Sequence, residues 1–248
     1  MDEFVAFSQN SQESLKMATL SSSLPVNTII IGEKAVGKNH LAKVISPNAK
    51  VFEALELENL LSKNQIDLKT TDEIIINNIQ KITSTKNFLE HISYHDIKIV
   101  ATTTKHKEIY DDFFEVKIEV PPLRQRKEDV EFLTKSYMKE AKKLFLIDKD
   151  FEDLHIDLSN NAISLKKSIF RTVLFDSLNK EDIMDIFEEF LLKEFEKTTS
   201  YKELLPIFEI PLLKAGQKAF KSQLQMAKRF DINRNTLRKK LSENGLDG

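Results

Sequence analysis

Short, continuous apolar runs separated by polar segments characterise the first half of the chain. Runs rich in β-branched residues are typical of strands that a parallel sheet buries on both faces. They predict strands at residues 26–31, 67–80, 97–102 and 113–120, and a helical pattern over residues 39–45 follows the first strand. We therefore expect an α/β core with a parallel sheet over residues 1–126.

The second half of the chain has helical periodicity instead. Pro121 and Pro122 end the fourth apolar run, and the charged residues after them open a helix that continues through Leu144. We assign residues 127–178 to a helical lid on the core and residues 179–248 to a dimerisation and DNA-binding domain, for the reasons below.

Residues 182–195 are strongly amphipathic. Their apolar positions form one wide stripe of Ile183, Ile186, Phe187, Phe190, Leu191 and Phe195. This stripe exceeds what two short helices further along the chain could bury, so we expect it to pack against a second copy of itself. Packing against the helical lid is the alternative.

The C-terminal segment is typical of two short helices joined by a tight turn. Ser222, with Gln225 three residues later, predicts a capped start for the first helix. Leu224 and Ala227 would form the apolar face of that helix. Asp231 tolerates the backbone angles of a turn, and Asn233 can cap the second helix.

The second of these helices has one apolar and one basic face. The apolar face consists of Ile232, Leu237 and Leu241. On the other face, the candidates for contacts with base edges are Arg234, Asn235 and Arg238. The candidates for phosphate contacts are Ser222, Thr236, Lys239 and Lys240, and Gln223 belongs to the same DNA-binding set.

The charge distribution supports DNA binding. Residues 214–243 contain nine cations and two anions, a net charge of +7, whereas the whole chain has a net charge of −2. A basic block in a mildly acidic protein is typical of nucleic-acid binding. An ordinary solvated helical surface is the alternative.

A candidate phosphate-binding loop follows the first predicted strand. Its sequence, Gly-Glu-Lys-Ala-Val-Gly-Lys-Asn, runs from Gly32 to Asn39, between a strand and a helix. Gly32 and Gly37 would allow the backbone N–H groups to face phosphate, and Lys38 would reach the β- and γ-phosphate oxygens. Gly32, Gly37, Lys38 and Asn39 are therefore the candidate nucleotide-binding residues.

Three stretches resemble NtrC-type, sigma-54-dependent bacterial enhancer-binding regulators. Residues 231–241, Asp-Ile-Asn-Arg-Asn-Thr-Leu-Arg-Lys-Lys-Leu, are similar to the recognition helix of their C-terminal Fis-type helix-turn-helix. Residues 211–213, Pro-Leu-Leu, match the helix through which that domain dimerises. Residues 121–129, Pro-Pro-Leu-Arg-Gln-Arg-Lys-Glu-Asp, match the segment between their AAA+ core and lid. The resemblance implies an AAA+ core and lid followed by a Fis-type domain.

Several positions depart from that family's catalytic pattern. Asn39 replaces the Ser or Thr that holds magnesium, and Asn77 and Asn78 replace the Asp-Glu pair of Walker B. Asp72 and Glu73 lie at the amino end of that strand, away from the edge where ligands bind. By resemblance, Thr104 stands at the sensor Asn position, and Lys166 keeps the charge of the lid's sensor Arg without its bidentate fork.

Two further elements of the family are missing from the first half of the chain. The first Arg is Arg124, so the core has no candidate for the family's arginine finger. No Gly occurs between Gly37 and Asn77, so the Gly-Ala-Phe-Thr-Gly-Ala loop that touches sigma-54 is absent. We therefore expect a degenerate core without ATP hydrolysis or sigma-54 contact, no catalytic residues and no enzymatic activity.

Composition sets the remaining limits. The chain has no Cys, which excludes disulfides and thiolate metal sites and suits a reducing cytoplasm. His91 and His95 are four residues apart but have no carboxylate-rich surroundings, so we expect no metal site. No apolar run resembles a signal peptide or a membrane span. We expect a cytoplasmic protein that requires no cofactor and does not contact a membrane.

These observations predict a transcription regulator that binds double-stranded DNA as a homodimer. RNA polymerase or another regulator is a further candidate partner, and ATP or another nucleotide is the candidate ligand of the loop at residues 32–39. One alternative is an ATP-hydrolysing sigma-54 activator with unusual catalytic residues. Another alternative is an adaptor that senses a nucleotide.

Overall fold

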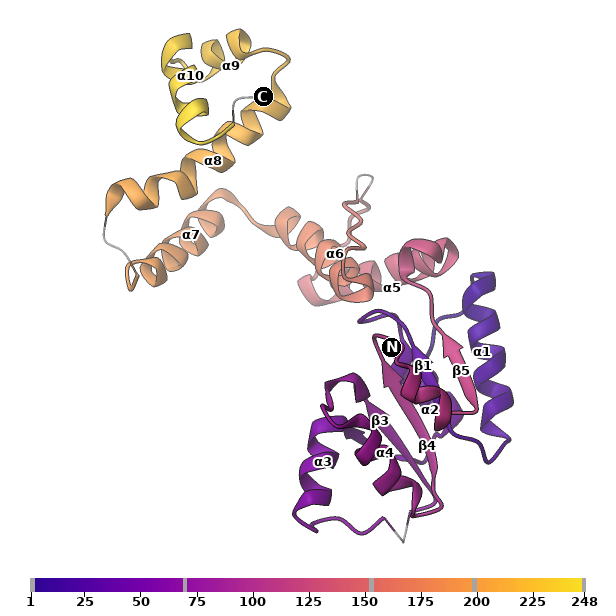
Figure 1. Cartoon of the computed structure of the whole chain (residues 1–248). Helices are drawn as coiled ribbons and strands as arrows, with labels where there is room; N and C mark the ends of the chain where they lie inside the picture. Colours follow the sequence, from indigo (N-terminus) through magenta and orange to yellow (C-terminus); the bar gives the residue numbers. More distant parts are fainter. Residues whose placement is uncertain (1–2, 69–70, 152–153, 198–199, 247–248) are drawn as a thin grey trace. The chain divides into compact units, whose positions relative to one another are not determined.

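The computed structural model describes residues 3–68, 71–151, 154–197 and 200–246 (Figure 1). The chain divides into two compact units, Met1–Ser177 and Leu178–Gly248. Each unit has a buried apolar core of its own, and each is described by itself.

The first unit contains a five-stranded parallel sheet with the strand order β2-β3-β4-β1-β5. Its strands are β1 (Thr28–Ile31), β2 (Lys50–Glu53), β3 (Glu73–Asn77), β4 (Lys98–Thr103) and β5 (Val116–Glu119). The predicted α/β class and the four predicted strands are confirmed, although β3 and β5 are shorter than their apolar runs. The additional strand, β2, is a mostly exposed edge strand with the sequence Lys-Val-Phe-Glu, so no apolar run marks it.

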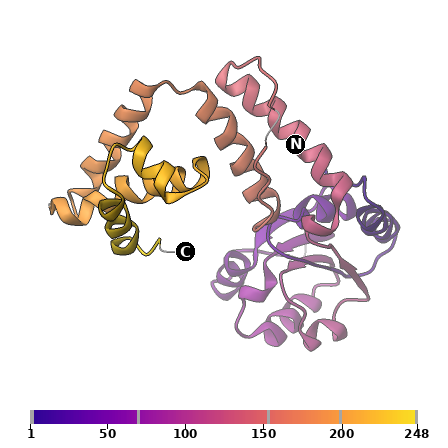
Figure 2. The same ribbon diagram turned by 90° about the horizontal axis from the view of Figure 1, so that it is seen from above.

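Helices cover both faces of this sheet (Figures 1 and 2). α1 (Gln9–Ser22) and α2 (Lys38–Ile45) pack on one face, and α3 (Ala54–Ser62) and α4 (Thr85–Ser93) pack on the other. Ile29 belongs to the core on one face, and its neighbour Ile30 belongs to the core on the opposite face. Successive side chains of a strand point to opposite faces, which explains why the apolar runs are continuous. Short 3₁₀ helices follow β3, β4 and β5, namely η1 (Ile79–Lys81), η2 (Glu108–Asp112) and η3 (Leu123–Gln125).

α1 has no clear apolar pattern, and polar contacts hold much of it against the sheet. Ser11, Ser14 and Ser21 are buried. The Ser14 hydroxyl donates to the backbone oxygen of Glu119 (2.9 Å), at the end of β5. The hydroxyls of Ser21 and Thr28 lie 2.8 Å apart. Small hydroxyl side chains thus let this helix approach the strands closely.

Two further helices of the first unit, α5 (Lys127–Phe145) and α6 (Asn161–Ser177), pack against each other. The predicted helix after the two prolines is α5. Leu133, Leu165 and Ile169 are buried between the two helices. At the start of α5, Arg126 Nε and Asp129 Oδ2 form an ion pair of 2.6 Å whose side chains are 1% and 0% exposed.

The second unit consists of α7 (Lys180–Glu194), α8 (Tyr201–Ala219), α9 (Gln223–Arg229) and α10 (Arg234–Glu243). α8, α9 and α10 share a small core of Leu213, Met226, Ala227, Leu237 and Leu241. α7 begins with a capping box between Asn179 and Asp182, and none of its residues is buried. Its apolar stripe is therefore exposed, with Ile186 at 52% and Phe190 at 44%.

Within the described ranges, no helix combines the length and the apolar character needed to cross a membrane.

Candidate functional site

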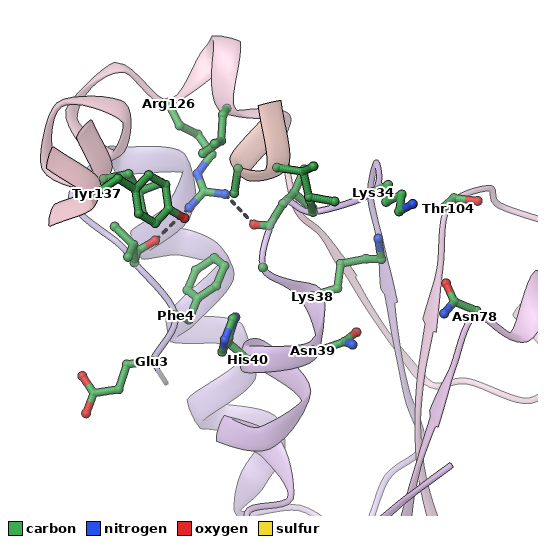
Figure 3. A pocket seen from close by; sticks show the side chains of 18 of the residues that line it. Glu3, Phe4, Lys34, Lys38, Asn39, His40, Asn78, Thr104, Arg126 and Tyr137 are labelled. Atoms are coloured by element: carbon green, nitrogen blue, oxygen red, sulfur yellow. Dashed lines mark hydrogen bonds between the residues drawn. The ribbon is translucent and has the colours of Figure 1, made fainter. Parts of the chain in front are cut away.

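A cavity of about 570 Å³ opens at the carboxyl end of the parallel sheet (Figure 3). Ligands of open α/β sheets bind at this edge, and the volume falls in the range of small-molecule sites. The loop between β1 and α2 contributes Lys34 and Gly37 to its lining, and the first turn of α2 contributes Lys38 and Asn39. The segments after β3 and β4 contribute Asn78, Gln80 and Thr104, and the N-terminal segment, α5 and α6 contribute Phe4, Tyr137 and Ile163.

The loop between β1 and α2 requires both of its glycines. Gly37 has a φ of 102°, in the left-handed region that favours glycine, and α2 begins immediately after it. A Cβ on Gly32 would lie 2.6 Å from the backbone oxygen of Val120, so a side chain there would push the loop away from β5. The helix start that faces the cavity is a favourable place for an anion, because its backbone N–H groups have no partner within the helix.

Lys38 folds back over this loop. Its Nζ donates to the backbone oxygens of Gly32 (2.8 Å) and Glu33 (2.7 Å). The residue is only 7% exposed, and burial lowers the pKa of the Lys38 ammonium from 10.5 to about 8. A buried cation that has only neutral carbonyl partners is well placed to bind the negative charge of a phosphate.

The opposite wall carries amide and hydroxyl groups (Figure 3). Asn77 is buried at the end of β3, and its Oδ1 accepts from Thr102 Oγ1 (3.3 Å). The backbone N–H of Asn78 donates to the same Thr102 hydroxyl (3.2 Å). The structure thus places Asn77, Asn78 and Thr104 at the carboxyl edge, and Glu73 at the opposite end of β3.

A carboxylate that sequence reasoning missed lies beside this wall. Glu53 is the last residue of β2, and its Oε2 accepts from Asn78 Nδ2 (3.0 Å). Lys81 Nζ lies 3.5 Å from the same oxygen. The β2–β3 register places Glu53 beside Asn77, so the Glu53 carboxylate and the two asparagines lie together at the carboxyl end of the sheet. No motif marks Glu53 in the sequence, because β2 itself has no apolar run.

Hydrogen bonds join the loop to η3 and to the start of α6. Arg124 forms two bonds to the Glu33 carboxylate, Nη1 to Oε2 (2.9 Å) and Nη2 to Oε1 (2.6 Å). Asn161 Nδ2 also donates to Glu33 Oε2 (3.0 Å) and to the backbone oxygen of Lys34 (3.0 Å). These bonds lower the pKa of the Glu33 carboxyl from 4.5 to about 2, and the bonds from Arg124 have the larger effect.

Arg126 joins the loop to the N-terminal segment and the start of α5. Its guanidinium donates to the backbone oxygens of Val36 (2.8 Å) and Val5 (2.8 Å) and lies 5.1 Å above the centre of the Phe4 ring (Figure 3). Asp129, from α5, balances its charge. Arg126 is almost fully buried and thus supports the cavity wall as a structural cation.

Lys166 lies elsewhere than the resemblance suggested. Its Nζ pairs with Glu140 Oε1 (2.7 Å) and lies over the rings of Tyr137 and Phe170, at 5.5 and 5.1 Å. The α6 residues that line the cavity are the apolar Ala162 and Ile163. Lys166 therefore holds α5 and α6 together instead of presenting a charge to the cavity.

In the second unit, α9 and α10 begin at the two predicted caps. Ser222 Oγ accepts from the backbone N–H of Gln225 (3.2 Å), and Asn233 Oδ1 accepts from that of Asn235 (2.8 Å). Between the two helices, Asp231 has a φ of 51°, as a tight turn requires. The predicted two short helices and the turn between them are confirmed as local geometry.

The residues of α10 divide between a core and an exposed face. Leu237 and Leu241 are fully buried, and Ile232 packs against them. Of the predicted DNA-binding residues, Ser222, Arg234, Asn235, Thr236, Arg238 and Lys239 are exposed, and Gln223 is half-buried. Lys240 is directed to Glu209 of α8, with which it forms an ion pair. Leu224 is 63% exposed, so the prediction that it forms the apolar face of α9 is wrong; Met226 and Ala227 do so.

Neither a protein-family model nor a curated protein sequence matches this chain. Solved structures do match it. NtrX from Brucella abortus in complex with ATP is similar with a TM-score of 0.59 at 16% identity, over 98% of this chain and 69% of that chain. The ADP complex gives a TM-score of 0.60 at 16% identity, over 99% and 69%. At this identity, the likeness concerns the fold.

The α/β fold with its parallel sheet matches the AAA+ P-loop fold of these structural neighbours. The prediction that the protein is not an enzyme is wrong, because the structures that match this chain bind nucleotides. The NtrX structures that share the fold contain ATP and ADP, the substrate and the product of ATP hydrolysis. The prediction compared single positions with the family's motifs, including Asn77 and Asn78, whereas all strands of a parallel sheet end at the same edge. A group missing from one strand can therefore be supplied by its neighbour.

Proposed function

We propose that this protein is a nucleotide-binding transcription regulator that binds double-stranded DNA through α9 and α10 as a Fis-type helix-turn-helix. The observation that carries the proposal is the exposed basic face of α10, held in place by the buried Leu237 and Leu241. A capped helix with arginine and asparagine on its solvent side suits recognition in the major groove. Arg234, Asn235 and Arg238 contact base edges in this proposal, and Ser222, Thr236 and Lys239 contact phosphates.

Lys240 has a different role in this proposal. Because it pairs with Glu209, it anchors α10 to α8 and sets the angle at which the basic face is presented. Gln223 follows the cap of α9 and contributes a polar contact beside Ser222.

The nucleotide part of the proposal rests on the loop between β1 and α2. Gly37, the start of α2 and Lys38 meet at the cavity, which suits a nucleoside di- or triphosphate. Asn39 offers an uncharged amide oxygen at the same place. Because Glu33 in this loop is bonded to Asn161 of α6, a bound phosphate that moves the loop would also move the lid. Nucleotide sensing is thereby included in the proposed function.

The exposed stripe of α7 supports a homodimer as the DNA-binding form, since two copies would present two basic faces to a pseudo-palindromic site. A Phe190→Glu substitution would then convert the dimer to a monomer in sedimentation velocity, without loss of helical circular dichroism.

The proposal includes no glycine-loop contact with sigma-54, because the segment between Gly37 and Asn77 contains no glycine.

The test is binding of the full-length protein to fragmented genomic DNA from its source organism, with and without ATP, followed by sequencing of the retained fragments. Enrichment of a few pseudo-palindromic sites is expected. On such a site, Arg238→Ala should weaken binding about 5- to 150-fold, as the loss of a bidentate base contact does. Binding to random DNA at the same salt concentration should fall much less.

Arg171→Ala is the matched control, because Arg171 is an exposed arginine of α6 in the other unit. It should bind specific and random DNA as the unmodified protein does. Failure to enrich any site, or an equal loss on both kinds of DNA with Arg238→Ala, would overturn the proposed DNA readout. Sites that are retained only with ATP would support nucleotide sensing.

A further inference from the structure

The cavity wall after β3 contains amides where hydrolysis of a nucleotide requires a proton acceptor. Asn77 and Asn78 are neutral at all accessible pH values and cannot accept the proton of an attacking water. The carboxylate of the loop itself, Glu33, is held by Arg124 and Asn161. Its lowered pKa makes it a weak base.

Glu53 supplies the missing carboxylate group from the neighbouring strand. Its Oε2 is 3.0 Å from Asn78 Nδ2, and Asn78 lines the cavity opposite Lys38 (Figure 3). The Glu53 side chain is 48% exposed, so water reaches it. The hydrogen bond from Asn78 and the nearby ammonium of Lys81 both hold the carboxylate at the strand edge.

We infer that Glu53 is the general base for hydrolysis of the nucleotide at this site. The inference rests on the proposed nucleotide binding. A water molecule beside Asn78 attacks the γ-phosphorus of ATP, and its proton passes to the Glu53 carboxylate. The bond from the γ-phosphorus to the bridging oxygen breaks, and the electron pair leaves with ADP. Glu53 then releases the proton to solvent, and inorganic phosphate is the second product.

Glu53 and Asn78 are thus a carboxylate–amide pair in which β2 carries the acid and the end of β3 carries the amide. The pair can be tested by exchanging its members. Glu53→Gln removes the base and keeps the shape of the side chain. The double variant Glu53→Asn, Asn78→Glu returns one carboxylate to the edge, on the other strand. Glu56→Gln, on the exposed side of α3, is the control for the loss of one negative charge.

The experiment measures ATP turnover with magnesium, the Kd of a fluorescent ATP analogue, and the Kd of ADP with aluminium fluoride as a transition-state analogue. With Glu53→Gln, turnover should fall about 100-fold or more, as for loss of a general base. The Kd for the ATP analogue should change less than threefold, and the aluminium fluoride complex should weaken at least tenfold. Glu56→Gln should match the unmodified protein, and the double variant should recover at least a tenth of its turnover.

Turnover by Glu53→Gln equal to that of the unmodified protein would overturn the inference. Binding of ATP without hydrolysis by the unmodified protein would also overturn the inference, although the proposed nucleotide binding would then stand. An unmodified protein that binds no nucleotide would instead overturn the proposed function at this site. If Glu53→Gln unfolds, as thermal denaturation would reveal, the double variant decides, since recovered turnover requires a carboxylate at this edge.

Discussion

Binding of a nucleotide at the loop between β1 and α2 should depend on pH through Lys38. The perturbation is a rise in pH from 7.5 to 9.5, over which phosphates with a second pKa near 6 remain ionised. In the free protein the pKa of Lys38 is lowered to about 8 by burial, so the ammonium loses its proton within this range. A phosphate beside it favours the charged form and raises the pKa again. Binding should therefore take up a proton.

The size of the effect follows from the fraction of protein with charged Lys38. With a pKa of about 8, this fraction is roughly three quarters at pH 7.5 and about 3% at pH 9.5. If only the charged form binds, the affinity for ATP should fall about 25-fold over this range. Near pH 8, about half a proton should be taken up per ATP bound. The affinity is thus greatest below pH 8 and is lost as the pH rises through that value.

The assay is titration calorimetry at several pH values in pairs of buffers with different ionisation enthalpies. The difference in observed heat between two buffers gives the number of protons taken up. Lys38→Met should bind more weakly and show little proton uptake at pH 8. Lys34→Met, at an exposed lysine of the same loop, should keep the proton uptake. Constant affinity between pH 7.5 and 9.5, with no proton uptake by the unmodified protein, would refute the assignment of Lys38 to the phosphate.

Three further predictions concern stability. Arg124→Gln should lower the melting temperature at neutral pH. Because the pKa of Glu33 is lowered from 4.5 to about 2, the difference in melting temperature from the unmodified protein should shrink as the pH falls from 4.5 toward 2. A difference in melting temperature that stays constant over this range would contradict the pairing of Arg124 with Glu33. Asp129→Asn should cost about 3–5 kcal/mol in urea unfolding because it leaves the buried Arg126 uncompensated, whereas Asp150→Asn, at an exposed ion pair with Lys142, should cost less than about 1 kcal/mol. Leu237→Ala should destabilise the second unit by about 2–5 kcal/mol, and Leu224→Ala by no more than about 0.5 kcal/mol; equal losses would show that Leu224 is part of the core after all.

Features that depend on neighbouring residues could be predicted from the sequence. β1, β3 and β4 are apolar runs because each of these strands is buried on both faces, and this pattern is visible without a structure. The loop at residues 32–38 is recognisable because its glycines and lysine have fixed spacing between a strand and a helix. Ser222 and Asn233 cap their helices through bonds to residues three and two positions away. Such short-range interactions depend only on residues that are close together in the sequence.

The tertiary structure alone decided which distant residues meet. Glu53 bonds to Asn78, 25 residues away, and Asn161 bonds to Glu33, 128 residues away. Lys240 has the residue type of a phosphate contact, but the packing of α10 on α8 pairs it with Glu209. Leu224 has the residue type of a core position, but the rotation of α9 buries Met226 and Ala227 instead. The sequence by itself determined four of the five strands, the loop and the two capped C-terminal helices. The charges around the cavity and the residues of the basic face depended on how the elements pack, because burial and pairing are properties of neighbours in space.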